Sequence, residues 1–279
     1  MTAVERDADH TAGRYGVASR SVAVSLSLLG TFSMLLWKHS ASADELADIV
    51  ERLTPSVVGI GAAYPPRAQP GRRASRRLLG TGFVVNGPGG SLIATNSHVV
   101  PVDLDVDGKE RIVVFSGSGT AAQQRIATVV REDPVHDLAL LAYEGASLPA
   151  MELADTLPRP GESIAFTGFP IGAVLGLYPT TQTGIVGAIT PVAMAAERAG
   201  QLSAAQVSRL RNPFTVYQLD AIAYPGNSGS AVYNATTGRV IGVMNSVFVK
   251  ESREALLQRP SGIAYAIPIE HLKALLVPR

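Results

Sequence analysis

LGTGFVVNGPGGSLIATNSHVV, residues 79–100, contains the pattern that decides the fold class. Two short runs rich in Val, Leu and Ile flank a Gly/Pro-rich turn, and His98 follows the second run. Short apolar runs bounded by turn residues are typical of β-strands. Because the pattern recurs along the chain with no alternating helices, it predicts an all-β sandwich or barrel. The expected strands are Val57–Ala62, Leu79–Val85, Ser91–Ala94, Ile112–Phe115, Ile126–Val130, Leu138–Tyr143, Ser163–Thr167, Thr183–Ile189, Thr215–Leu219, Ala231–Tyr233, Val240–Phe248 and Gly262–Ile267.

Four segments depart from this strand pattern. Asp44–Leu53 has apolar residues on one helical face and acidic residues in its first turn, which predicts a short amphipathic helix. A second short helix is expected at Pro268–Leu276. Ala193–Arg211 is rich in Ala, Gln, Glu and Leu, which favours a helical insertion between strands. Tyr64–Arg77 is rich in Pro, Gly and Arg and is expected to form a solvated loop; a patch for polyanions or lipid headgroups is the alternative.

The composition narrows the possible functions. The chain has 279 residues, of which 46% are hydrophobic and 17% charged, so it can bury a core and is neither disordered nor fibrous. Its formal net charge is +1, which argues against nucleic acid as a partner. The chain has no cysteine, which excludes disulfides, thiol nucleophiles and thiolate metal sites. We expect no metal and no other cofactor, since the sequence has no metal-ligand cluster and no phosphate-binding glycine loop.

Residues 1–43 have the order of parts of an export signal. Arginines precede an uncharged apolar run, Ser21–Trp37, and the small triplet Ala41-Ser42-Ala43 follows it. The run is longer than most cleaved signals and just short of the ~20 residues that span a bilayer comfortably. Two predictions therefore stay open, a cleaved signal peptide and an uncleaved membrane anchor. Both place a single domain, residues 44–279, outside the cytoplasm, either free in a bacterial periplasm or anchored to the inner membrane and facing the periplasm.

Three motifs in a fixed order carry the expected chemistry. His98 lies in ATNSHVV after a short strand, Asp137 precedes an apolar strand in HDLALL, and Ser228 lies in the turn PGNSGSAV. A serine hydroxyl needs an adjacent base to attack an amide, and histidine has the pKa suited to that role. A buried carboxylate fixes the imidazole tautomer and stabilises the imidazolium that forms. Together the three residues predict nucleophilic catalysis.

The turn around Ser228 also supplies the expected oxyanion donors, the backbone N–H groups of Gly226 and Ser228. Each motif alone has another interpretation: His98 as a structural histidine, Asp137 as a turn or cap residue, and the glycine-flanked string as an ordinary turn. Asp133 lies close enough in the sequence to compete with Asp137. The joint occurrence of the motifs favours the catalytic interpretation, and their order differs from that of α/β-hydrolases.

From about Asp44 to Leu276 the chain resembles the protease domain of the HtrA/Deg family of trypsin-like serine proteases. The resemblance implies two six-stranded antiparallel β-barrels, with His98 as base, Asp137 as orienting acid and Ser228 as nucleophile in the cleft between them. It implies polypeptide substrates and leaves a homo-oligomer open. Besides the three motifs, the matching segments are Thr54–Ile60, Gly80–Val85, Gly168–Gly172, Thr183–Val186, Leu219–Ala221, Gly242-Val243 and Tyr265–Pro268.

The sequence departs from the family pattern in three places. Family members often carry a C-terminal PDZ module, and we expect none here. The usual string Gly-Asn-Ser-Gly-Gly reads Gly-Asn-Ser-Gly-Ser, with Ser230 at the last position. The expected insertion Ala193–Arg211 is longer than the family pattern and lies between strands that lead toward the active-site loops.

These features predict a serine endopeptidase that cuts unfolded or damaged proteins outside the cytoplasm. The alternatives are a catalytically silent member that serves as a binding module, and an esterase. The resemblance also assigns an uncharged pocket to the side chain before the scissile bond, which favours Ala, Val, Leu or Ile because an unpaired buried cation costs several kcal/mol. Alternatively, the pocket residues are only barrel core. They are Ile222, Ala223, Ser246, Val247 and Phe248.

Overall fold

The computed structural model describes residues 41–64, 76–105, 107, 109–170, 176–192, 213–245 and 262–278. By its internal contacts the chain divides into Met1–Ala43 and Asp44–Arg279, and the fold below is that of the second unit. Four predicted features lie wholly or mostly outside the described residues: the apolar run Ser21–Trp37, residues 65–75 of the loop Tyr64–Arg77, the insertion Ala193–Arg211 and the pocket residues Ser246–Phe248. The last two residues of that loop, Arg76 and Arg77, begin strand β2 (Arg76–Gly87). None of the helices in the described ranges has both the length and the hydropathy that a membrane span requires.

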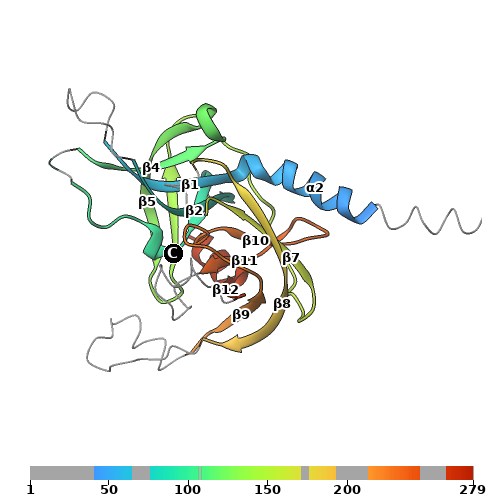
Figure 1. Ribbon diagram of the computed structural model, residues 1–279. Coiled ribbons are helices and arrows are strands. Elements are labelled where there is room, and N and C mark those ends of the chain that lie inside the picture. The colour runs from blue at the N-terminus through green and yellow to red at the C-terminus, as the bar shows by residue number, and fades with distance from the viewer. Residues whose placement is uncertain are drawn as a thin grey trace, which may run out of the picture. The chain divides into compact units, whose positions relative to one another are not determined.

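The first half of the unit forms a closed six-stranded antiparallel barrel with the strand order β1-β2-β3-β6-β5-β4 (Figure 1). The short apolar runs become strands because each can pair on both sides once the barrel closes, which leaves no free edge. Its strands are β1 (Val57–Ala63), β2 (Arg76–Gly87), β3 (Gly90–Thr95), β4 (Arg111–Ser116), β5 (Gln123–Asp133) and β6 (Leu138–Tyr143).

The second half repeats this architecture with the order β10-β11-β12-β9-β8-β7 (Figure 1). The prediction of an all-β chain with two six-stranded antiparallel barrels is therefore confirmed. The strands of the second barrel are β7 (Ser163–Gly168), β8 (Thr180–Pro191), β9 (Thr215–Asp220), β10 (Ala231–Asn234), β11 (Val240–Asn245) and β12 (Ile263–Pro268).

Each barrel has its own apolar core, and a third core joins them. Ile60 and Ile93 belong to the cluster inside the first barrel, and Phe166 to the one inside the second. The joining cluster includes Phe83 from β2 and Phe169, which follows β7. Each buried Phe or Leu side chain contributes about 1.5–3 kcal/mol relative to exposure, so the joining cluster holds the facing sides of the barrels together.

Two helices complete the joining core. Helix α2 (Ala41–Leu53) buries Ile49 and Leu53 in it, and α6 (Ile269–Leu276) buries Leu272. Both helices were predicted, but α2 begins three residues before the expected Asp44 and includes the Ala41-Ser42-Ala43 triplet. Alanine is the best helix former, which accounts for the earlier start.

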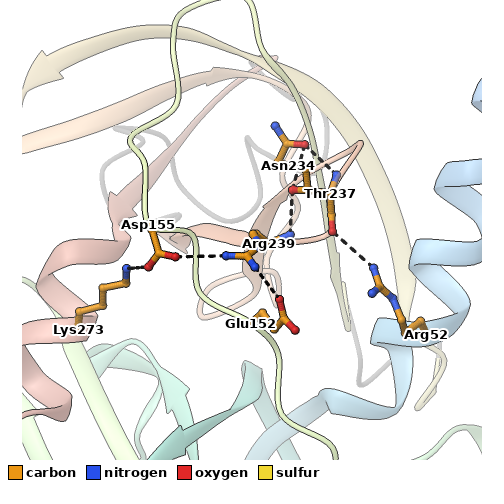
Figure 2. Close-up of polar contacts among 7 residues, drawn as sticks. All are labelled: Arg52, Glu152, Asp155, Asn234, Thr237, Arg239 and Lys273. Carbon is orange, nitrogen blue, oxygen red and sulfur yellow. Dashed lines mark hydrogen bonds and ion pairs between the residues drawn. The ribbon is translucent and has the colours of Figure 1, made fainter.

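A polar network ties both helices to the β10–β11 turn (Figure 2). Arg239 in that turn pairs with Asp155 at 3.2 Å, and Lys273 of α6 reaches the same carboxylate at 3.0 Å. Arg52 of α2 donates to the carbonyl of Thr237 over 3.5 Å. Lys273, followed by Arg239, lowers the pKa of Asp155. Because these groups are exposed, each pair adds little stability, and the network mainly fixes where the helices sit.

Candidate active site

The structure brings His98 and Asp137 together. His98 is the middle residue of the 3-10 helix η2 (Ser97–Val99), which follows β3. Its ring Nδ1 lies 2.6 Å from Asp137 Oδ2, and its backbone N–H donates to Asp137 Oδ1 over 2.9 Å. An ionised carboxylate only accepts hydrogen bonds, so the ring proton lies on Nδ1 and Nε2 is left as the basic nitrogen. The contact therefore selects the tautomer that a general base requires.

Asp137 is held by both barrels. Its φ of 54° is uncommon for a residue other than glycine, and such a conformation persists only where surrounding contacts fix it. From the first barrel, Asn96 Nδ2 and the backbone N–H of Ser97 donate to the Asp137 carbonyl at 3.1 and 3.2 Å. From the second barrel, Asn245 Nδ2 donates to Asp137 Oδ2 over 2.6 Å. These bonds replace water around a residue that is only 6% exposed.

Asn245 is a site residue that the sequence pattern does not predict. It ends β11, whose six residues are all buried, and its side chain is the polar exception in that strand. A buried amide needs a hydrogen-bond partner. A polar residue at the end of an apolar strand is therefore the sequence feature that could have indicated a role for Asn245. The sequence cannot say that the partner is Asp137, because the two lie 108 residues apart.

Ser228 lies in the loop between β9 and β10 and is 4% exposed. Its carbonyl oxygen accepts the backbone N–H of Thr81, in β2 of the first barrel, over 2.9 Å. A Cβ at Gly80 would lie 3.0 Å from that Ser228 carbonyl oxygen and 2.8 Å from the side chain of Val99, the residue after His98. Gly80 of β2 therefore lies between the Ser228 backbone and the turn that contains His98.

The backbone around Ser228 depends on two glycines. The N–H of Asn227 donates to the Tyr224 carbonyl over 3.0 Å, and Gly226 within this turn has a φ of 103°. Pro followed by a glycine of positive φ is typical of a type II turn. Gly229 has a φ of 85°, and a Cβ there would lie 2.0 Å from a carbonyl oxygen of β2. No other residue fits at Gly229 without moving the loop.

Asp133, the competing carboxylate, contacts a different histidine. Asp133 Oδ2 lies 2.6 Å from His136 Nδ1, and Asp133 Oδ1 accepts the backbone N–H groups of Val135 and His136, each over 3.1 Å. The His136 ring stacks on His271 of α6, with ring centroids 3.9 Å apart, and Phe214 packs edge-on against both rings. Asp137, not Asp133, is therefore the carboxylate that contacts His98.

Two groups around His136, Asp133 and His271, have lowered pKa values. Burial alone would raise the pKa of Asp133, but the hydrogen bonds from His136 and Val135 and the charge of His136 outweigh it, so the pKa is lowered. Burial, and then the neighbouring His136, lower the pKa of His271 to about 4, although Asp133 acts in the opposite direction. His271 therefore stays neutral at pH values where an exposed histidine is protonated.

Comparison with known proteins identifies the family. Residues 80–243, more than half of the chain, match the model of the trypsin-like peptidase domain. This chain belongs to the trypsin-like peptidase family. The match covers the three motifs and most of both barrels.

Several curated proteins resemble this trypsin-like peptidase. The "Probable periplasmic serine endoprotease DegP-like" of Halomonas elongata is 29% identical over 81% of this chain and 40% of its own length. "Serine protease HTRA3" of Rattus norvegicus is 30% identical over 81% of this chain and 42% of its own length. "Serine protease PepD" of Mycobacterium tuberculosis is 31% identical over 70% of this chain and 39% of its own length. The chain thus spans about 40% of the length of these relatives.

The pocket predicted for this peptidase is described only in part. Ile222 is 42% exposed, and Ala223 is half-buried against the core of the second barrel. Both lie in the segment that leads into the Ser228 loop. The facing wall, Ser246–Phe248, lies outside the described residues, so the pocket as a whole stays a prediction.

Ser230, where this peptidase departs from the HtrA/Deg pattern, is fully buried behind the loop. A Cβ at Gly168 would lie 2.3 Å from Ser230 Oγ and 3.0 Å from Asn227 Oδ1, so glycine at the end of β7 leaves room for both side chains. Within the described ranges, no group of three or more His, Asp or Glu side chains is arranged to hold a metal ion.

Proposed function

We propose that this trypsin-like peptidase is a serine endopeptidase with Ser228 as nucleophile, His98 as general base and Asp137 as the group that orients His98. The observation that carries the proposal is the two-point contact of Asp137 with the His98 ring, at 2.6 Å, and backbone, at 2.9 Å. It leaves Nε2 of His98 as the basic nitrogen, on a turn that is separated from the Ser228 backbone by Gly80. Relatives named as serine proteases over about 80% of the chain support the same activity.

In the acylation step, Ser228 Oγ attacks the carbonyl carbon of the peptide bond while His98 Nε2 takes the hydroxyl proton. The carbonyl electron pair moves onto oxygen, and the backbone N–H groups of Gly226 and Ser228 stabilise this oxyanion. The C–N bond then breaks as His98 returns its proton to the leaving amine. The product of this step is an acyl ester on Ser228.

Hydrolysis of the ester follows the same route in reverse. A water molecule loses a proton to His98 and attacks the ester carbonyl, and the second oxyanion occupies the same two N–H donors. The C–O bond breaks, Ser228 regains its proton from His98, and the new carboxyl end of the substrate leaves. Asp137 stays ionised throughout and stabilises the imidazolium in both steps.

The test combines an active-site probe with a digest. A fluorophosphonate probe should label the wild-type protein at Ser228, and peptide mapping should locate the adduct. Unfolded casein should be cut by the wild-type protein and not by Ser228→Ala. Labelling without cleavage of any peptide would favour the esterase alternative. Absence of both labelling and cleavage, in a protein that melts cooperatively, would favour the silent binding module.

The site of action is proposed to lie outside the cytoplasm. The export signal expected in residues 1–43 supports this location, and so does the word "periplasmic" in the names of several relatives. N-terminal sequencing distinguishes the two forms: a start at Asp44 indicates a released enzyme, and an intact N-terminus in washed membranes indicates an anchored one. A soluble cytoplasmic pool of full-length protein would contradict both.

The proposed preference is for small or medium apolar side chains before the scissile bond. None of the five pocket residues is charged, so an incoming Lys or Arg would find no carboxylate in the pocket. An apolar side chain gains about 25 cal/mol per Å² that it buries. Mass spectrometry of the products of denatured proteins should show cuts after Ala, Val, Leu or Ile. Frequent cuts after Lys or Arg would overturn the pocket assignment and leave the catalytic assignment intact.

A further inference from the structure

Thr81, in β2 of the first barrel, makes two hydrogen bonds to the Ser228 loop of the second barrel. Its side-chain hydroxyl donates to the carbonyl oxygen of Gly226 over 2.7 Å, and its backbone N–H donates to the carbonyl oxygen of Ser228 over 2.9 Å. Its own carbonyl oxygen accepts the hydroxyl of Thr95 over 2.8 Å. Thr81 therefore links β3, the strand that precedes His98, to the loop that carries the nucleophile.

The direction of the hydroxyl bond is determined by a fourth contact. The backbone N–H of Phe169 donates to Thr81 Oγ1 over 3.0 Å, so the oxygen acts as an acceptor there. The hydroxyl has a single proton, and that proton is left for the carbonyl of Gly226. Thr81 is fully buried and Phe169 is 1% exposed, so no water competes for these groups. The Gly226 carbonyl is thus held by a donor whose own orientation is fixed.

Gly226 is the place in the loop where such a restraint matters most. It has no Cβ, so its own backbone preference does little to hold its φ of 103°. The two carbonyls that Thr81 binds belong to Gly226 and Ser228, the two residues whose N–H groups are the proposed oxyanion donors, and each N–H precedes the bound carbonyl of its own residue by one Cα. The peptide plane between Gly226 and Asn227 is bound at both of its polar groups, the carbonyl by Thr81 and the N–H by the Tyr224 carbonyl. Without the Thr81 hydroxyl the plane would keep one of these two bonds and would be held less firmly.

We infer that Thr81 is a positioning residue for the oxyanion donors of Gly226 and Ser228. This inference rests on the proposed function, because it assumes that those N–H groups face the oxyanion. Gly80 serves the same contact, because a Cβ there would lie 3.0 Å from the Ser228 carbonyl oxygen, whereas Gly82 faces the first barrel, where a Cβ would lie 2.7 Å from the side chain of Ile60. Glycine at position 80 thus lets the backbone of β2 approach the loop at Thr81.

The key variant is Thr81→Val, which keeps the branched shape and removes the hydroxyl. Removing one oxyanion donor outright costs about 10²–10³ in kcat, and misaligning a donor should cost less, about 10- to 100-fold. We expect this loss in kcat, with KM changed less than about threefold, since ground-state binding does not use these N–H groups. Thr81→Ser, which restores the hydroxyl, should recover most of the activity.

The matched control is Thr167→Val. Thr167 is a buried threonine of β7 whose hydroxyl bonds to those of Thr181 and Tyr233, at 2.8 and 2.9 Å. Its loss should lower the melting temperature as much as Thr81→Val does while leaving kcat unchanged. If Thr81→Val does not fold, Thr81→Cys, whose thiol is a weak donor, replaces it and should give an intermediate loss.

A pair of inhibitors separates positioning from a general structural effect. A peptide aldehyde forms a hemiacetal with Ser228 and places an oxyanion against the two N–H groups, whereas the matching peptide alcohol binds without one. Thr81→Val should weaken the aldehyde by the same factor as kcat and leave the alcohol unchanged. If Thr81→Val weakened the aldehyde and the alcohol equally, the inference about Thr81 would be wrong. It would also be wrong if Thr81→Val had the kcat of wild type while Ser228→Ala was inactive. Neither result would contradict the proposed function. Full activity in Ser228→Ala would overturn the proposed function and this inference with it.

Discussion

Two Asp–His pairs in this molecule have the same contact and different surroundings. Asp137 and His98 meet at 2.6 Å between a carboxylate oxygen and Nδ1, and so do Asp133 and His136. In each pair a backbone N–H of the histidine also binds the other carboxylate oxygen. By the local geometry alone, either pair could supply a general base with a fixed tautomer.

What separates the pairs is how far their partners lie along the chain. Asp133 and His136 are three residues apart, so one turn makes their contact, and both side chains are about a quarter exposed. Asp137 and His98 are 39 residues apart, and Asn245 joins them from the other barrel. An Asp–His contact therefore does not identify an active site by itself. The difference lies in the second barrel, which reaches the first pair through Asn245 and carries the proposed nucleophile Ser228.

Removing the histidine of each pair should give the largest contrast. We expect His98→Ala to lower kcat by about 10⁴–10⁶, and Ser228→Ala to do the same, because such residues act as a unit. His136→Ala should stay within a few-fold of wild type, since its partners are Asp133 and the rings of His271 and Phe214. Casein cleavage with each purified variant is the measurement. Comparable losses in His98→Ala and His136→Ala would contradict the distinction between the pairs.

The carboxylates should differ in the same way. Asp137→Asn permits the wrong imidazole tautomer while keeping the shape, and a loss of about 10⁴ in kcat is expected. Asp133→Asn keeps an acceptor for His136 and should leave kcat nearly unchanged. Single-turnover acylation by an activated ester measures the step directly. An active Asp137→Asn together with an inactive Asp133→Asn would reverse the assignment of the two carboxylates.

The strands could be predicted from the sequence because their signal is local. Runs such as Leu138–Tyr143 and Val240–Asn245 are apolar because both faces of a barrel strand meet other side chains. The ends were predicted less well, because partners decide them. Strand β5 extends to Gln123 and Asp133, beyond the expected Ile126–Val130, since polar residues there still pair with β4 and β6.

Only those site residues could be predicted from the sequence whose side chains and neighbouring residues are typical of a catalytic motif. His98, Asp137 and Ser228 carry reactive groups in recognisable strings, so the sequence identifies them as candidates. Asn245 and Thr81 lie in no recognisable catalytic string, and the contacts that connect them to the site span 108 and 145 residues. The choice between Asp133 and Asp137 also depended on the fold, because both lie between the apolar runs of β5 and β6 and each has a histidine within four residues or in another motif; only the structure shows that Asp137 is the one that contacts His98.

Substituting Asn245 should have a smaller effect on kcat, and it tests whether the hydrogen bond from the second barrel to Asp137 supports catalysis. Asn245→Ala removes the amide that donates to Asp137, a bond to a charged group worth about 1.5–3 kcal/mol. We expect a loss of about 10- to 100-fold in kcat, with most of the fold retained. Asn234→Ala is the control: Asn234 Oδ1 accepts the N–H groups of Thr236 and Thr237 at 3.0 Å, so its loss should lower stability and not kcat. Equal kcat in the two variants would remove Asn245 from the site.

The smallest expected effect is a pH dependence of stability from His271, whose ring stacks on His136 of the second pair. The pKa of His271 is about 4 in the folded chain, lowered first by burial and then by His136, against about 6.5 when unfolded. Above pH 6.5 the residue is neutral in both states and contributes nothing. As the pH falls from 6.5 toward 4, the unfolded chain binds a proton that the folded chain does not, so the free energy of unfolding decreases.

His271→Phe keeps a ring for the stack on His136 and removes this titration. Because His271 is only partly buried, we expect the wild-type protein to lose about 1–2 kcal/mol more than the variant between pH 7.5 and 4.5. The lowered pKa of Asp133 acts at lower pH, since that group contributes stability above its unfolded pKa of 3.8 and loses it as the pH falls further. Urea unfolding in a Ser228→Ala background, which prevents self-digestion, measures both curves. Parallel curves for the two proteins would mean that His271 titrates alike in the folded and unfolded chains, and would remove it as a source of the pH dependence.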